Sequence, residues 1–182
     1  MGRWLLPLLP LLLAGCSWTG DAFYSARDAQ IAVAAGDYLT SDDHGAPGRG
    51  DRIHVAILPD GMTSFAPAEG GREESLVGFV ALGPDRHYFI MWVAKLEGEE
   101  APAGETPYGL VEALPGGRYR LYLPDCNRDR AVAVAAGAVP TSAGAQPDCR
   151  FPDRAHLEAG FAAYVRGTNE SMELIPAPPP AS

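Results

Sequence analysis

The chain has 182 residues, 47% of them hydrophobic, and its 14 basic against 23 acidic side chains give a formal net charge of −9. This length suits one domain with a single hydrophobic core. The acidic balance argues against a nucleic-acid partner, because such proteins neutralise phosphates with basic patches. It permits a basic protein partner but does not require one, and a solvated acidic surface is the preferred explanation of the charge.

The chain begins with one basic residue, Arg3, before the uncharged apolar run Trp4–Leu13. A positive charge followed by a short apolar run is typical of a signal peptide. A transmembrane helix needs about 20 apolar residues, and this shorter run also contains prolines. We therefore predict that residues 1–15 are a signal peptide that is removed from the mature protein.

The small residues Ala14 and Gly15 stand directly before Cys16. The sequence Leu13-Ala14-Gly15-Cys16 resembles the lipobox of bacterial lipoproteins, in which the cysteine receives diacylglycerol and its amino group is acylated after cleavage. The resemblance implies a mature chain that begins at Cys16 and is held in the membrane by two or three acyl chains. The alternative is an ordinary secreted protein that is cleaved near Ala14 and keeps Cys16 as a plain thiol.

Ser17 bears on the choice of membrane, because an aspartate after the cysteine tends to retain well-studied lipoproteins in the inner membrane. The resemblance therefore implies a periplasm-facing protein of the cell envelope, in the outer membrane rather than the inner. The mature chain would keep 167 residues, with 13 basic and 23 acidic side chains. We expect residues 16–22 to form a short tether and residues 23–175 to form a single β-rich domain.

Within this domain, Ser25–Asp28 fits one helical turn and residues 36–39 fit a first strand. Three β-hairpins are then expected, because turn sequences rich in proline and glycine separate strand-like segments. The paired segments are 53–57 with 62–66, 76–82 with 87–96, and 108–114 with 119–123. They predict an antiparallel meander, either an open sheet or a small barrel.

Two of these segments differ in the number of faces that they should bury. Residues 118–123 alternate, so that Arg118 and Arg120 lie on the side opposite Tyr119 and Leu121, as in a half-exposed strand. Residues 88–94 are apolar on both faces. We expect such a strand to be covered on both sides.

The expected cover is a helix over residues 153–166, with Asp153 as its N-cap and apolar residues at helical spacing. Residues 129–136 are alanine-rich and favour a short helix, although a strand is not excluded. Residues 172–175 are expected to add an edge strand, and residues 176–182 a disordered proline-rich tail.

Once Cys16 is assigned to lipid, Cys126 and Cys149 remain as an even pair in an exported chain. An oxidising compartment favours a disulfide between them, which would connect the C-terminal helix to the sheet. The chain has no Cys-x-x-Cys, and the spacing fits no zinc motif. The fold class that we predict is α+β, mainly antiparallel β, with a C-terminal helix and one disulfide.

No catalytic motif, phosphate-binding loop or dinucleotide fingerprint is present in the sequence. The acidic segments Asp42–His44 and 97–105 are better explained as solvated loops than as metal sites. We therefore predict no enzyme activity, no cofactor and no metal. In its layout, the mature chain resembles small β-rich lipoproteins of Gram-negative bacteria, a resemblance that implies no catalytic residues.

A candidate ligand or partner surface combines two strands. Tyr88 and Trp92 could line a ligand cavity, with plain core as the alternative. Arg118 and Arg120, with Tyr122 beside them, could form a recognition patch, with a solvated face as the alternative. We predict a non-enzymatic interaction or structural module, anchored to the membrane and possessing an envelope protein partner. The alternative functions are an inhibitor of a basic hydrolase such as lysozyme, and a carrier of lipid or a small ligand.

Overall fold

The computed structural model describes residues 17–41, 50–68, 74–82, 87–95, 106–141, 148–166 and 171–178, without the side chains of residues 26, 74 and 87–95. The predicted signal peptide, Cys16 and the two acidic segments 42–44 and 97–105 lie outside this described part. In chain order, its elements are β1 (Trp18–Gly20), a 3-10 turn η2 (Ala26–Asp28), β2 (Gly36–Thr40), β3 (Arg52–Ile57), β4 (Thr63–Pro67), β5 (Glu74–Ala81), β6 (His87–Lys95), β7 (Thr106–Leu114), β8 (Arg118–Tyr122), α1 (Arg130–Ala135), β9 (Val139–Pro140), β10 (Cys149–Arg150), α2 (Arg154–Val165) and β11 (Met172–Pro176).

The predicted class is confirmed: the described chain is mainly antiparallel sheet, with a C-terminal helix and one disulfide. All three predicted hairpins form, as β3–β4, β5–β6 and β7–β8. In the last turn, Gly116 and Gly117 have φ values of 79° and 71°. Glycine adopts this left-handed conformation without the steric penalty of a Cβ atom, so the turn can be tight.

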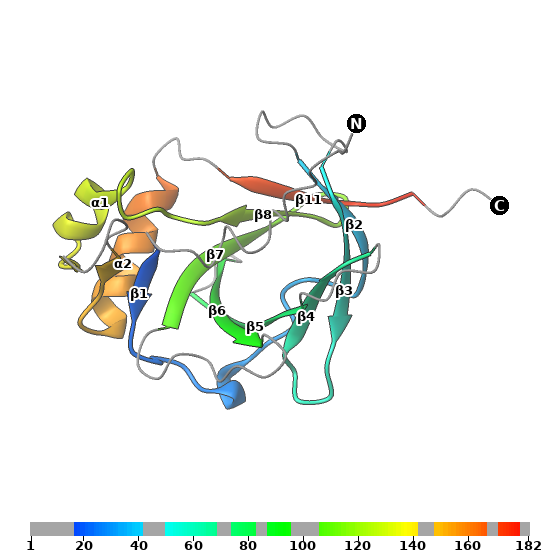
Figure 1. Cartoon of the computed structure of the whole chain (residues 1–182), viewed down its shortest axis with the longest axis horizontal. Helices are drawn as coiled ribbons and strands as arrows, with labels where there is room; N and C mark the ends of the chain where they lie inside the picture. The colour runs from blue at the N-terminus through cyan, green and yellow to red at the C-terminus, as the bar shows by residue number, and fades with distance from the viewer. Residues whose placement is uncertain are drawn as a thin grey trace, which may run out of the picture.

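Eight of the described strands form a cyclic pairing order, because each pairs with two antiparallel neighbours. The order is β2, β3, β4, β5, β6, β7, β8 and β11, and β11 pairs again with β2. In Figure 1 these strands surround a common interior. The predicted edge strand at 172–175 is therefore wrong in its position: β11 has a partner on both sides, β8 and β2.

The interior of this strand arrangement is one of two hydrophobic clusters. Apart from Val33, which precedes β2, its described side chains come from inward positions that alternate with outward ones along the strands. The buried members are Val33, Tyr38, Ile53, Val55, Phe65, Val77, Phe79, Val111, Tyr119, Leu121 and Leu174.

The second cluster, which we call the outer core, lies between the outer faces of β7 and β8 and the two helices (Figure 1). From α2 it receives Leu157, Phe161 and Tyr164, all 0% exposed. The predicted helix is thus confirmed, and its Asp153 cap accepts a hydrogen bond from the His156 backbone at 3.0 Å. The alanine-rich segment forms the short helix α1, as favoured. None of the helices in the described part is long and apolar enough to cross a membrane.

Residues 18–20, assigned from sequence to a tether, instead form strand β1. This strand pairs with β7 and in parallel with β10, and all three of its residues are buried. The Trp18 ring centroid lies 5.1 Å from those of Phe151 and Phe161 and 5.4 Å from that of Tyr164. The prediction of a tether fails because three residues are too short to show a strand pattern, whereas burial of one tryptophan provides a large hydrophobic contribution.

The predicted disulfide joins Cys126, just after β8, to Cys149 in β10, and both residues are 0% exposed. Cys149 is also the register partner of Trp18.

At the other end of the chain, the start of the predicted disordered tail is ordered. Pro176 belongs to β11, and the Ala177 N–H donates to the Asp37 carbonyl at 2.8 Å.

Candidate functional site

The five residues of the predicted surface lie on two strands of the sheet. Tyr88 and Trp92 are on β6, in register with Val111 and Val77 respectively. Their side chains lie outside the described part of the structure, so the predicted cavity wall or core role of these two residues stays a prediction.

The other three residues lie on β8 and are brought together on the outer face of the sheet. Arg118 and Arg120 alternate with Tyr119 and Leu121, which are buried in the interior cluster. The half-exposed strand is therefore as predicted. Tyr122, also on the outer face, is 8% exposed.

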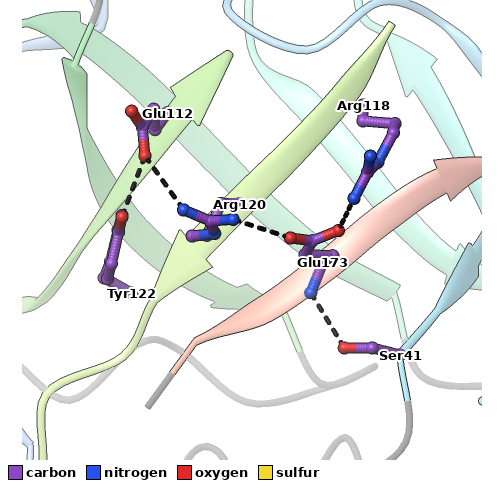
Figure 2. A network of polar contacts seen from close by, with 6 residues as sticks. All are labelled: Ser41, Glu112, Arg118, Arg120, Tyr122 and Glu173. Atoms are coloured by element: carbon purple, nitrogen blue, oxygen red, sulfur yellow. Dashed lines mark hydrogen bonds and ion pairs between the residues drawn. The ribbon is translucent and has the colours of Figure 1, made fainter. Parts of the chain in front are cut away.

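The functional groups of these three residues form part of a polar network on the outer faces of β7, β8 and β11 (Figure 2). One carboxylate oxygen of Glu173 accepts a hydrogen bond from Arg118, and the other accepts from Arg120 Nη2 at 2.8 Å. The second guanidinium nitrogen of Arg120 lies 3.8 Å from Glu112 Oε2. The Tyr122 hydroxyl donates to the same Glu112 oxygen at 2.8 Å. We call these five residues the outer polar network.

Two hydrogen bonds to Ser41 fix the backbone of Glu173, whose carboxylate lies at the centre of this network. The Glu173 N–H donates to the Ser41 hydroxyl at 3.0 Å, and the Ser41 N–H donates to the Glu173 carbonyl at 3.0 Å. Because Ser41 directly follows β2, the network connects the end of β2 to β11, β8 and β7. It thereby contributes to holding the late strand β11 in place.

The charges of the network stabilise one another. The pKa of Glu173 is held below its ordinary value, first by the hydrogen bond from Arg120 and then by that from Arg118. The hydrogen bond to Glu173 is also the main cause of a raised pKa at Arg120. Burial raises the pKa of Tyr122. At neutral pH Arg120 is therefore a cation, Glu173 is ionised and the Tyr122 hydroxyl is neutral.

The network is accessible from solvent. The side chains of Arg118 and Arg120 are 44% and 36% exposed, whereas those of Glu112 and Glu173 are 28% and 19% exposed. The arginines are thus more exposed than the carboxylates that orient them. Such an arrangement can present guanidinium edges to a partner carboxylate or carbonyl, with rotamers already fixed by internal ion pairs.

Glu112, Glu173 and Ser41 were not predicted as members of this site. Glu112 could have been predicted from the hairpin register. The tight turn at Pro115–Gly117 sets which residues of the two strands lie opposite each other, and it places Glu112 opposite Arg120. Glu173 is more than fifty residues from either arginine in the sequence, and its position follows only from the insertion of β11 beside β8.

Metal ligation receives no support in the described part of the chain, where no group of three or more His, Cys, Asp or Glu side chains could hold a metal ion. His54 instead lies 2.8 Å from Asp37, and His156 lies 2.7 Å from Asp153. The predicted lipidation site Cys16 lies outside the described part, directly before the ordered Ser17.

No protein-family model matches the chain, and neither a curated protein nor a solved structure gives a significant match.

Proposed function

We propose that this chain is a lipid-anchored protein of the bacterial cell envelope that faces the periplasm and acts as a non-enzymatic interaction or structural module. The observation that carries the proposal is the sequence Leu13-Ala14-Gly15-Cys16, which follows an apolar run and ends directly before the folded domain. The outer membrane is the proposed location, because serine rather than aspartate follows the cysteine.

One structural feature supports an extracytoplasmic location. The disulfide between Cys126 and Cys149 is typical of proteins that fold in an oxidising compartment. It is fully buried beside Trp18, the second residue after the proposed lipidated cysteine. Formation of the disulfide and correct docking of the N-terminal strand would thus occur in the same compartment.

The outer polar network is the proposed partner surface. Its arginines are exposed and oriented, and its ion pairs lie on strands rather than on loops, which favours a defined geometry for recognition. An envelope protein with an acidic or carbonyl-rich face is the expected partner.

The two alternative functions receive less support. A carrier requires space for its ligand, but eleven buried side chains pack together in the interior of the described strands. An inhibitor of a basic hydrolase would need exposed carboxylates at its binding surface, and within the outer polar network Glu112 and Glu173 are both already paired with Arg120. The interaction module is therefore the function that the described residues favour.

Lipidation is tested by mass spectrometry of the protein purified from its host membranes. Trypsin should release an N-terminal peptide covering residues 16–27, because Arg27 is the first basic residue after Arg3. We expect this peptide to carry the mass of a diacylglyceryl group and an acyl chain. The Cys16→Ser variant should keep its signal peptide and lack the lipid. An unmodified N-terminus that begins near Gly15 would contradict the proposal.

The partner surface is tested by affinity capture from detergent-solubilised envelopes. The Arg118→Ala/Arg120→Ala double variant should lose a stoichiometric partner that the native protein retains. An Arg130→Ala variant is the control, because Arg130 is exposed at the start of α1, away from the network. Equal recovery of the partner by all three proteins would exclude the outer polar network as the interface.

A further inference from the structure

The described chain begins one residue after the proposed lipid anchor, and its first residue is already fixed to the domain. The Ser17 N–H donates to Asp148 Oδ1 at 2.9 Å, and the Ser17 carbonyl accepts from the Cys149 N–H at 3.0 Å. Ser17 also forms an antiparallel bridge with Asp125. The next residue, Trp18, is 0% exposed. No flexible spacer therefore separates residue 16 from the fold.

This attachment limits the distance between the domain and a bilayer. Consecutive Cα atoms are about 3.8 Å apart, so the Cα atom of Cys16 lies within roughly 4 Å of that of Ser17. A flexible linker of n residues would reach about 5–6 Å multiplied by the square root of n, but here no linker residue is present. Acyl chains on Cys16 would thus start at the surface of the domain.

We infer that the domain lies directly on the membrane, with the surface around Ser17 in contact with the lipid headgroups. This inference rests on the proposed lipidation of Cys16. The contacting surface, which we call the anchor surface, contains Asp125, Asn127 and Asp148. Asn127 belongs to it because two residues span at most about 7 Å from Asp125, which pairs with Ser17.

The carboxylates of the anchor surface are already hydrogen-bonded within the protein. Asp125 Oδ1 accepts from the backbone N–H groups of Asn127 and Arg128 at 2.7 and 3.1 Å. Asp148 Oδ1 accepts from Ser17. Internal donors reduce the cost of moving a carboxylate from bulk water into the headgroup layer.

Two exposed apolar side chains near the same surface favour a lipid environment. Val134 and Val139 have exposures of 47% and 64%. Val139 lies in β9, the neighbour of β10, so it is about 10 Å from β1 across two strand spacings. Val134 lies on α1, which precedes β9.

Contact at the anchor surface would leave the outer polar network free for a partner in the periplasm. Ser17 pairs with Asp125, which follows the C-terminal end of β8, whereas Arg118 is the first residue of β8. Arg120 and Arg118 precede Asp125 by five and seven residues, which in an extended chain correspond to roughly 17 and 23 Å. The anchor therefore lies beyond one end of β8, and Arg118 lies at the other end.

The inference is tested with the lipidated full chain in vesicles of phosphatidylethanolamine and phosphatidylglycerol that also contain a lipid with a fluorescence quencher on its headgroup. A fluorophore is attached, after formation of the native disulfide, to Asn127→Cys at the anchor surface or to Ala113→Cys at the far end of β7. Both positions are exposed. A second form of each protein carries about ten glycine and serine residues between Cys16 and Ser17, which give a reach of roughly 17 Å. The insert begins with serine, so that the residue after Cys16 is unchanged.

We expect severalfold stronger quenching at position 127 than at position 113 in the native spacing, and loss of this difference when the linker is inserted. Equal quenching at the two positions in a chain whose Cys16 carries lipid by mass spectrometry would overturn the inference and leave the proposed lipidation intact. A chain without lipid on Cys16 would overturn both.

Discussion

Trp18 provides a direct test of the conclusion that the first residues after Cys16 are part of the core. The side chain is 0% exposed and packs against three aromatic rings of the outer core. A tryptophan buries about 150–250 Å², and at about 25 cal/mol per Å² this burial contributes roughly 4–6 kcal/mol. Since alanine retains a small part of this area, we expect Trp18→Ala to lower the free energy of unfolding by roughly 3–5 kcal/mol.

The measurement is urea unfolding of the soluble mature chain with Cys16→Ser, followed by far-ultraviolet circular dichroism. With a slope of about 2 kcal/mol per molar urea, the midpoint should fall by roughly 2 M. If Trp18→Ala does not fold, Trp18→Phe remains measurable. Its expected loss is smaller, about 1–2 kcal/mol, because phenylalanine keeps a ring and removes the indole N–H, a buried donor without a partner in the described structure.

The matched control is Ile31→Ala, a large-to-small change at a side chain that is 63% exposed. This variant should unfold within about 0.5 kcal/mol of the native chain. A Trp18→Ala variant that is as stable as the Ile31→Ala control would refute the assignment of β1 to the core. The interpretation of residues 16–22 as a tether would then be favoured again.

Three further predictions concern the disulfide and two titrating groups. Replacement of both Cys126 and Cys149 by alanine should lower the free energy of unfolding by about 3.4 kcal/mol. This value is the loop-closure entropy that the disulfide removes from the unfolded chain at a sequence separation of 23. An unchanged urea midpoint would contradict this prediction. Glu173→Gln should destabilise the fold by about 1 kcal/mol at pH 7. Because the folded pKa of Glu173 lies below its ordinary value of 4.5, its contribution is present above that value and is lost as the pH falls further, so the stabilities of native and variant chains should converge in acid. Burial raises the pKa of Tyr38 from 10.0 to about 12. The contribution of Tyr38 to the free energy of unfolding should therefore be constant below pH 10 and should fall as the pH rises from 10 to 12. The Tyr38→Phe variant should lose less stability than the native chain over that interval.

Local chemistry was sufficient to predict much of this fold. The turn at Pro115–Gly117 predicts a hairpin because proline presets one backbone angle and glycine tolerates positive φ. The alternation in residues 118–122 predicts which side chains of β8 face outward. An aspartate at position 153 predicts the start of α2, since its carboxylate can accept a hydrogen bond from the first turn. Each inference needs only neighbouring residues.

The candidate site was predicted only in part, for the same reason. Arg118 and Arg120 could be assigned to the outer face from their own strand. The carboxylate between them comes from Glu173, which reaches them only because β11 pairs with β8. That pairing closes a loop of some fifty residues, and no short-range signal in the sequence specifies it.

Local features of the sequence were sufficient to predict the hairpins, the disulfide and the capped C-terminal helix, because turn residues, strand alternation and cysteine count are properties of short segments. The position of β11 between β2 and β8 and the place of β1 in the core follow only from the tertiary structure. Both depend on contacts between distant segments: Glu173 with the arginines of β8, and Trp18 with the rings of α2. Burial and ion pairing stabilise such contacts only after the intervening loop has brought the two segments together. The stabilisation therefore cannot be inferred from either segment alone.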